Sequence, residues 1–195
     1  MSRRKERDDL KNQIMEAAWE LFLEKGYEKT TVNDIIKKAG TSKGGFYYYF
    51  KAKEELLNFL YTIFDREYEK FYRNMDKKLN SLLQLKLLNQ CISYFIEANI
   101  SVELLSALYQ WQLAEKKQEN FWGADRYYIK LVKNIIVEGQ ERGEIRKDIS
   151  VDELVHHVVL LERGILMDWC VQKGAFSIGY FGTMDFGFYI EFMRV

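Results

Sequence analysis

The chain contains no proline in 195 residues, although average usage of about 5% would give roughly ten. Because proline disrupts helix interiors, its absence favours a nearly all-helical protein. Only two cysteines are present, Cys91 and Cys170, and they lie far apart in the sequence. Two cysteines do not make a disulfide framework, so a reducing compartment is expected.

Long apolar runs are also missing. No segment approaches the 18 or so uncharged apolar residues of a membrane-spanning helix, and the N-terminus, MSRRKERDDLKNQ, lacks the apolar run of a signal peptide. We therefore expect a soluble, cytoplasmic protein with no membrane partner. Hydrophobic residues make up 48% and charged residues 30% of the chain, which predicts a globular core and argues against wholesale disorder.

Signatures of catalysis are absent as well. The sequence has no Ser-His-Asp order, no HExxH, no P-loop and no dinucleotide-binding glycine fingerprint, so no enzyme activity, catalytic residue or cofactor is expected. The two histidines, His156 and His157, each follow an acidic residue by four positions, as metal ligands on a helix could. The two pairs point about 100° apart and do not converge, which favours a solvated helix face and no metal site.

The most informative segment is residues 26–57, GYEKTTVNDIIKKAGTSKGGFYYYFKAKEELL. Thr31 can cap a helix over residues 32–39 that Gly40 ends, and Ser42 can cap a second helix over residues 43–49. A helix, a tight turn with glycine and a second helix form a helix-turn-helix, whose second helix enters the DNA major groove. This segment therefore predicts DNA binding.

The pieces TTVNDIIKKAG and TSKGGFYYYFKAKEELL resemble the DNA-binding signature of the TetR family of bacterial transcriptional regulators. A looser likeness appears at residues 135–146, IIVEGQERGEIR, and 164–169, GILMDW. The resemblance implies an all-α fold with a three-helix helix-turn-helix DNA-binding domain over residues 1–53. A long helix starting near Lys53 would join it to a larger helical effector-binding and dimerisation domain over residues 54–195.

By matching positions, the resemblance implies the following DNA-contacting residues: Thr31, Lys43, Gly44, Gly45, Tyr47, Tyr48, Tyr49 and Lys53. Tyrosine suits this role because its hydroxyl can bind phosphate and its ring can lie against a thymine methyl. On aromatic content alone, the three tyrosines would be packing residues. The surrounding signature instead favours DNA contact for Tyr47. Phe46 and Phe50, in contrast, are assigned to the core.

Charge gives weak support to DNA binding. Residues 1–53 hold 12 Lys/Arg against 8 Asp/Glu, and the remainder holds 17 against 21, so the first segment is the basic one. Four basic residues near the N-terminus form either an arm that reaches the minor groove or a solvated tail, and the sequence leaves both open: Arg3, Arg4, Lys5 and Arg7.

Apolar periodicity predicts further helices. The first is expected over residues 9–25, and others over residues 81–98, 102–117, 124–142, 151–172 and 177–193.

The larger domain is rich in big aromatic side chains, which suit an aromatic or cationic effector of unknown identity. We expect a pocket lined by some of Tyr94, Glu97, Tyr109, Trp111, Trp122, Tyr128 and Trp169, with Glu103 as a second acidic candidate. An ordinary aromatic core is the alternative for each of these residues.

Two apolar stripes on the last two helices predict a four-helix interface between two copies of the chain. The first stripe is Leu154, Val158, Leu161, Ile165 and Trp169, and the second is Phe181, Met184, Phe188 and Phe192. The alternative is that both stripes serve only the core of one subunit.

Together these features predict a ligand-responsive transcriptional regulator without enzyme activity. The favoured form is a homodimeric repressor that binds a palindromic double-stranded operator and is released by a small-molecule effector. The alternative is a helical enzyme or ligand-binding protein with a vestigial helix-turn-helix. An activator, or an architectural DNA-binding protein without an effector, is also compatible with the sequence.

Overall fold

The computed structural model describes residues 2–114 and 126–195, with side chains from Asp9 onward in the first helix. Within these ranges the chain is helical and has no β-strand; Ile145 and Arg194 form an isolated bridge. The predicted all-α class is therefore confirmed.

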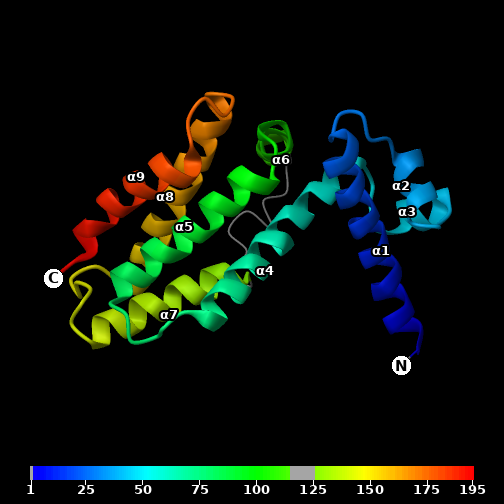
Figure 1. The fold of residues 1–195 in the computed structure, drawn as a ribbon. Coiled ribbons are helices and arrows are strands. Elements are labelled where there is room, and N and C mark those ends of the chain that lie inside the picture. The colour runs from blue at the N-terminus through cyan, green and yellow to red at the C-terminus, as the bar shows by residue number, and fades with distance from the viewer. Residues whose placement is uncertain (1, 115–125) are drawn as a thin grey trace. The chain divides into compact units, whose positions relative to one another are not determined.

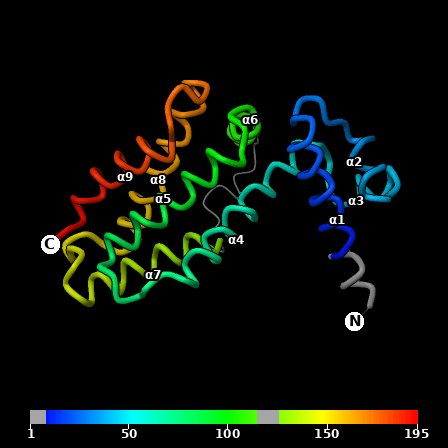
Figure 2. The backbone as a smooth tube through the Cα atoms, in the orientation of Figure 1, coloured from blue at the N-terminus to red at the C-terminus, as the bar shows by residue number. Residues whose placement is uncertain are grey.

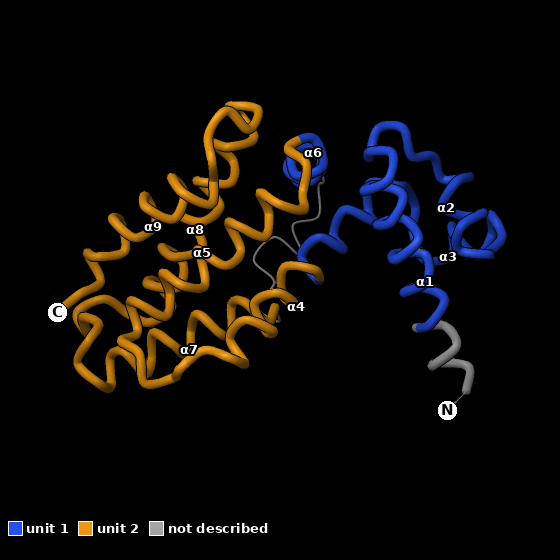
Figure 3. The backbone as a smooth tube through the Cα atoms, in the orientation of Figure 1, with its two compact units in different colours: residues 1–62, 103–113 blue, residues 63–102, 114–195 orange. Residues whose placement is uncertain are grey.

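The chain divides into two compact units (Figure 3). Unit 1 is Met1–Thr62 with Glu103–Leu113, and unit 2 is Ile63–Val102 with Ala114–Val195. The domain boundary after residue 53 stays a prediction.

Unit 1 begins with the helices of the predicted helix-turn-helix (Figure 1). Its elements are α1 (Ser2–Lys25), α2 (Val32–Lys38), α3 (Lys43–Tyr49), the 3-10 helix η1 (Lys53–Asn58), the start of α4 (Phe59–Asn74), and α6 (Val102–Ala114). Helix α2 packs against both α1 and α3. The core of this three-helix group consists of apolar side chains that are nearly inaccessible to water, among them Ile14, Ala18, Phe22, Ile35, Phe46 and Phe50.

The long helix does not start at Lys53 as predicted. The chain first forms η1, and α4 begins at Phe59. Ala52, in the position before η1, has no side-chain oxygen with which to cap a helix, and Glu55 Oε2 instead accepts the backbone N–H of Lys51 at 3.0 Å. Helix α4 then belongs to both units, because Phe59–Thr62 lies in unit 1 and the rest in unit 2.

Unit 2 is built around α5 (Ser81–Asn99), which packs against α7 (Tyr127–Glu141) and against the C-terminal elements. Helix α8 (Val151–Val171) contacts α7 and α9 (Thr183–Tyr189), and Figure 2 shows α8 and α9 side by side. Fully buried aliphatic and aromatic side chains from these helices form the core, including Leu82, Ile92, Ile96, Ile135, Leu154, Val158 and Phe186.

The helical stretch predicted over residues 177–193 is confirmed, but it is not a regular α-helix throughout. This segment consists of the π-helix η2 (Ile178–Gly182), α9 and the 3-10 helix η3 (Ile190–Met193). Gly179 in η2 approaches α5 closely, since a Cβ atom there would lie 2.6 Å from both Tyr94 Cδ1 and Glu97 Oε2. Thr183 Oγ1 donates a hydrogen bond to the Gly179 carbonyl at 2.7 Å. The irregular turn therefore coincides with a close packing contact, which periodicity alone does not reveal.

In the part of the chain that the structure describes, no single helix is long and apolar enough to cross a membrane. Helices α5 and α6 meet the combined requirement of length and apolar composition only as a pair that is bent at the break between them. The two cysteines form no disulfide.

Candidate DNA-binding and effector sites

The first helix of the helix-turn-helix has a complete N-terminal cap. Thr31 Oγ1 accepts the backbone N–H of Asp34 at 3.2 Å, and Asp34 Oδ2 accepts the backbone N–H of Thr31 at 2.8 Å. This reciprocal pair satisfies two of the donors that a helix start leaves without partners. Gly40, with a φ of 61°, takes the left-handed conformation that ends the helix and starts the turn. The capping predicted from the sequence is confirmed.

Helix α3 presents two tyrosines to solvent and holds its phenylalanines inside. Ser42 Oγ caps it by accepting the backbone N–H of Gly45 at 3.0 Å. Phe46 is completely buried and Phe50 nearly so, whereas Tyr47 is 45% and Tyr48 65% exposed. Large aromatic side chains are normally buried, so two of them side by side on the surface indicate a contact surface.

Tyr49 lies differently from its two neighbours. It is half-buried, its ring centre is 4.8 Å from that of Tyr48 in an edge-to-face arrangement, and 6.5 Å from that of Phe50. The predicted contact residues Lys43 and Gly44 are exposed at the start of α3. In this arrangement Tyr49 supports the position of Tyr48 and offers less of its own surface to a partner than Tyr47 does.

Gly45 is the second glycine of α3 and is half-buried. A Cβ atom at this position would collide with Thr41 Oγ1 and would lie 3.4 Å from Ser42 Oγ. Two adjacent glycines cost helix stability, by about 1 kcal/mol each relative to alanine. The close approach of the Thr41 hydroxyl gives a steric reason for glycine at position 45.

Lys53, predicted as a phosphate contact, has protein partners in unit 1. Its Nζ donates to the backbone carbonyl of Tyr27 at 2.9 Å and to that of Thr30 at 3.0 Å, and it lies 4.0 Å from the centre of the Tyr27 ring. These contacts tie the start of η1 to the loop between α1 and α2. They also place a positive charge close to the N-terminus of α2, where Thr31 is exposed.

Two other lysines of unit 1 are paired with carboxylates. Lys25 Nζ lies 2.6 Å from Asp34 Oδ2, and Lys38 Nζ lies 2.9 Å from Glu20 Oε2 and 2.8 Å from Glu24 Oε1. The hydrogen bonds from Lys25 and then Thr31 lower the pKa of Asp34, and those to Glu24 and Glu20 raise the pKa of Lys38. These pairs stabilise the α1–α2 packing, and their lysine charges are largely compensated within the protein.

The residues predicted to line an effector pocket belong to two different compact units. Tyr109 is buried and Trp111 half-buried, both on α6 in unit 1, whereas four others belong to unit 2: Tyr94, Glu97, Tyr128 and Trp169. Trp122 lies outside the described residues. The predicted pocket lining is thus divided between the two units, and the functional assignment of each residue stays a prediction.

Within unit 2, Tyr94 and Glu97 lie together on α5 against η2. Both are exposed, and Glu97 Oε2 accepts hydrogen bonds from Ser177 Oγ at 3.1 Å and from the Gly179 backbone N–H at 3.2 Å. Trp169 is buried, and its Nε1 donates to the Phe176 carbonyl at 3.0 Å. The contacts of Glu97 and Trp169 therefore hold the chain that enters η2.

Tyr128 belongs to a buried polar cluster in the interior of unit 2. Its ring stacks on that of Tyr68 from α4, with centres 4.4 Å apart, and both hydroxyls hydrogen bond to the carboxylate of Glu162 from α8. Glu162 was not identified from the sequence. Its position could have been, because it follows Val158 by four residues and thus places a charged side chain on the apolar face of α8.

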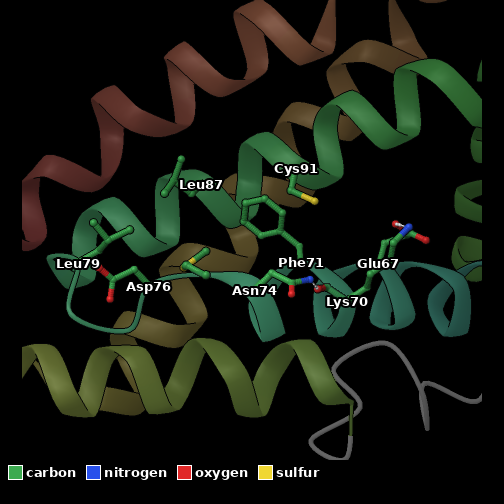
Figure 4. Close-up of a pocket in the computed structure, with 9 residues that line it drawn as sticks. Glu67, Lys70, Phe71, Asn74, Asp76, Leu79, Leu87 and Cys91 are labelled. Carbon is green, nitrogen blue, oxygen red and sulfur yellow. Dashed lines mark hydrogen bonds and ion pairs between the residues drawn. The ribbon is translucent and has the colours of Figure 1, made fainter.

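A groove of about 430 Å³ lies between α4 and α5 (Figure 4). Its lining is mostly apolar, with a half-buried thiol at one side: Glu67, Lys70, Phe71, Asn74, Met75, Asp76, Leu79, Leu87 and Cys91. Figure 4 shows Phe71 and Cys91 close to each other between the two helices. Burial raises the pKa of the Cys91 thiol, which disfavours its reactive thiolate form. Apolar atoms thus make up most of the surface of the groove, with charged and polar side chains among its lining residues.

The residues predicted to form a dimer interface fall into two groups. On α8, Leu154 and Val158 are buried in the core of unit 2, and Leu161 and Ile165 are half-buried. In the C-terminal elements, the four aromatic and methionine side chains are exposed: Phe181, Met184, Phe188 and Phe192. The second stripe is therefore available to a partner, whereas Leu154 and Val158 serve the subunit's own core.

Potential metal ligands do not gather in the described part of the chain, where no group of three or more His, Cys, Asp or Glu side chains could hold an ion. His156 and His157 are both exposed, and their ring centres are 6.2 Å apart.

The helix-turn-helix segment and much of the chain are similar to known bacterial regulators. The model of the bacterial regulatory proteins of the tetR family matches residues 14–59, which cover the second half of α1, the helix-turn-helix and η1. The transcriptional repressor DhaR of a Mycobacterium species is 24% identical over 197 residues, covering 92% of each chain. The transcriptional regulator QacR of Staphylococcus aureus is 28% identical over 141 residues, covering 70% of this chain and 73% of QacR.

Solved structures share the fold along almost the whole chain. The FadR repressor of Thermus thermophilus, solved with lauroyl-CoA, superposes with a TM-score of 0.75 at 19% identity, covering 92% of this chain and 91% of that one. FadR of Bacillus subtilis, solved with stearoyl-CoA, gives a TM-score of 0.64 at 22% identity, covering 89% and 94%. The helical fold of both units is thus one that solved regulators adopt.

Proposed function

Because the chain belongs to the TetR family of bacterial transcriptional regulators, we propose that it is a transcriptional repressor controlled by a small-molecule effector. The observation that supports DNA binding best is the arrangement of α3, in which Phe46 anchors the helix while Tyr47 and Tyr48 are exposed. Residues at the start of such a helix reach base edges, and tyrosine hydroxyls reach phosphates.

The proposed DNA contacts are divided by role. Lys43 and Tyr47 would face the major groove, with Tyr48 on the flanking backbone. Thr31 at the N-terminus of α2 would bind phosphate, since helix N-termini attract anions. Lys53 would add positive charge near that phosphate while keeping its carbonyl partners. Tyr49, Gly44 and Gly45 would shape α3 more than they contact bases.

We further propose that two copies bind together to a palindromic operator. The exposed aromatic stripe of Phe181, Met184, Phe188 and Phe192 is the surface that supports this dimer, because apolar side chains gathered on a surface indicate a partner. In a two-fold dimer, the two α3 helices would enter successive major grooves about 34 Å apart. Operator binding would place the protein in the bacterial cytoplasm.

The effector would bind in unit 2, and α4 would convey its effect. Helix α4 starts in unit 1 and continues into unit 2, where it lines the groove and supplies Tyr68 to the buried cluster. A ligand that favours a different position of α4 would favour a different spacing of the two α3 helices. Release from DNA then follows from the ligand's higher affinity for that state.

Fluorescence anisotropy with DNA from just upstream of the gene, compared with scrambled DNA at several salt concentrations, tests the proposal. A preference of roughly 10³-fold or more for the upstream DNA is expected for a specific regulator. Equal and steeply salt-dependent affinity for both DNAs would reflect phosphate attraction alone. That result with all candidate promoter DNAs would favour the alternative, a ligand-binding protein with a vestigial helix-turn-helix.

A further inference from the structure

One turn of α4 is tied to two other helices of unit 2 by polar side chains. Asp65 and Tyr68 lie three positions apart, so they share one face of α4. Asp65 binds the guanidinium of Arg126 through contacts of 2.7 Å and 3.3 Å and accepts the backbone N–H of Tyr128 at 3.4 Å. Tyr68 donates its hydroxyl to the carboxylate of Glu162 on α8. Both ties lie just beyond the point at which α4 passes from unit 1 into unit 2.

Asp65 also completes the start of α7. Arg126 is the N-cap residue of that helix, and its side chain caps no backbone group. Asp65 supplies the acceptor from a different helix, and its negative charge lies at the positive N-terminal end of α7. The side chains of Asp65 and Arg126 are only 18% and 21% exposed, so water screens this pair little. A bidentate pair of this kind restricts the geometry of both side chains.

Glu162 holds Tyr68 in the interior of unit 2. Its carboxylate is buried, and it also accepts hydrogen bonds from the Tyr128 hydroxyl and the Asn89 amide. Burial raises the pKa of Glu162 in spite of these donors. A buried carboxylate is unfavourable unless its donors are in place, because each missing donor leaves charge without a partner. The carboxylate therefore restricts the position of Tyr68, and through Tyr68 the position of α4.

The same helix is anchored in unit 1 by apolar side chains. Phe59 and Leu60, in the first turn of α4, are both buried. The helix is continuous from Phe59 to Asn74 and contains no glycine or proline at which it would bend easily. A displacement of the turn that carries Asp65 and Tyr68 within unit 2 is therefore passed on to the first turn of α4 in unit 1.

We propose that Asp65, Tyr68 and Glu162 are positioning residues for operator binding. Together with Arg126 and Tyr128 they form what we call the α4 latch. The latch holds α4 in the position that suits the spacing of two α3 helices on DNA. A looser latch lets α4 take further positions, and the affinity for operator falls with the fraction of protein in the competent one. This assignment rests on the proposed operator binding and names the contacts that regulate it.

The first test compares two variants that each remove one hydroxyl from the same carboxylate. Tyr68→Phe and Tyr128→Phe both keep the stacked rings, and both leave Glu162 with one donor fewer. Tyr68 belongs to α4, whereas Tyr128 belongs to α7. A merely structural role of these hydrogen bonds predicts equal effects of the two substitutions on DNA binding. The α4 latch predicts an effect of Tyr68→Phe alone.

Fluorescence anisotropy measures operator affinity, while thermal unfolding and sedimentation velocity compare the stability and oligomeric state of the variants. Tyr68→Phe is expected to weaken operator binding roughly three- to thirtyfold, the range typical of substitutions that alter coupling between distant sites. Tyr128→Phe is expected to stay within about twofold of the wild type, below that range, with a similar loss of melting temperature. An unchanged or higher affinity in Tyr68→Phe would overturn the assignment, and so would an equal loss in Tyr128→Phe.

Asp65→Asn gives an independent reading if the tyrosine variants do not fold. It keeps the shape of the side chain and removes the charge that pairs with Arg126. The matched control is Glu69→Gln, one turn further along, because the ion pair of Glu69 with Arg73 at 3.0 Å lies within α4 itself. Asp65→Asn is expected to weaken operator binding at least about threefold, and Glu69→Gln to leave it unchanged. Equal affinities of these two variants would overturn the assignment.

Hydrogen exchange of backbone amides separates a failure of the α4 latch from a failure of the proposed operator binding. Without DNA, residues 63–74 of α4 are expected to exchange faster in Tyr68→Phe than in Tyr128→Phe, because only the first substitution frees α4. If the wild type shows no operator preference, the proposed function fails and this comparison alone judges the latch. Faster exchange in Tyr68→Phe then supports the latch, and equal exchange in the two variants overturns it.

Discussion

The ammonium group of Lys53 lies 4.0 Å from the centre of the Tyr27 ring, 26 positions earlier in the chain, and donates to the carbonyls of Tyr27 and Thr30. This contact joins the end of the helix-turn-helix to the loop that precedes α2. Burial, followed by the negative charges of Glu54 and Glu28, raises the pKa of the Tyr27 hydroxyl, which therefore stays neutral beside the lysine. Lys53 thus has a structural role in addition to the DNA contact proposed for it.

Lys53→Met is expected to destabilise the protein by about 1–3 kcal/mol, because it leaves two carbonyls without their donor and removes a cation from an aromatic face. Thermal unfolding measures the loss, and the exposed Lys51→Met is the control. The salt dependence of DNA affinity distinguishes the two roles of Lys53. The slope is that of the logarithm of DNA affinity against the logarithm of salt concentration. If Lys53→Met reduces this slope by about one, Lys53 contacts a phosphate directly; an unchanged slope would leave Lys53 with the structural role alone.

Tyr47→Ala is expected to weaken operator binding at least about tenfold while the protein stays folded, because Tyr47 is exposed on α3 and supports no core contact comparable to that of Phe46. Anisotropy measures the binding and circular dichroism the fold. Tyr94→Ala, an equally exposed tyrosine in unit 2, is the control and should bind operator as the wild type does. Wild-type affinity in Tyr47→Ala would contradict the assignment of α3 as the recognition helix.

Thr31→Ala removes the cap of α2 and is expected to cost about 1 kcal/mol of stability, together with a loss of DNA affinity. Ser150→Ala is the matched control, since Ser150 and Glu153 form the same reciprocal cap at the start of α8 in unit 2. Both variants should lose similar stability in urea unfolding, but only Thr31→Ala should bind operator more weakly. Equal losses of DNA affinity in the two variants would show that stability, not phosphate contact, accounts for the effect.

Phe188→Arg is expected to weaken dimerisation at least about tenfold, because it places a charge on an apolar surface whose central phenylalanine is 78% exposed in the isolated chain. Sedimentation velocity over a concentration series measures the change. Leu113→Arg alters a similarly exposed side chain on α6 and should leave the oligomeric state unchanged. A monomeric wild type, or a Phe188→Arg variant that dimerises normally, would contradict the proposed interface.

The C-terminal segment should respond to acid. Contacts to Arg194 and then Lys86 lower the pKa of Glu191 from 4.5 to about 2. Because the folded pKa lies below the unfolded one, these ion pairs stabilise the protein fully above pH 4.5, and their contribution is lost as the pH falls toward 2. The carboxylate is 40% exposed, so the contribution is screened to about 0.2–1 kcal/mol.

Urea unfolding of wild type and Glu191→Gln tests this dependence. The stability difference should be present at pH 7 and should shrink progressively below pH 4.5. Glu141→Gln, at an exposed position of α7, is the control and should differ little from wild type at either pH. A difference that grows on acidification would contradict the assigned direction.

The helix-turn-helix could be predicted in detail because its determinants are local. Thr31, Gly40 and Ser42 act on backbone groups within a few residues of themselves, and Phe46 and Phe50 are assigned to the core by helical periodicity. The same reasoning predicted the helical stretch at residues 177–193 but not its π turn, which lies where Gly179 approaches Tyr94 and Glu97. That contact joins residues about 80 positions apart, so it leaves no periodic signal in the segment itself.

The amino-acid sequence by itself determined the all-α class, the positions of most helices and the DNA-reading motif, because capping, periodicity and the absence of proline act over a few residues. Only the tertiary structure decided which aromatic side chains are buried. It separated Leu154 and Val158 in the core from Phe181 and Phe188 on the surface. It also brought Glu162 together with Tyr68, Asn89 and Tyr128, since burial and pairing depend on how distant helices pack.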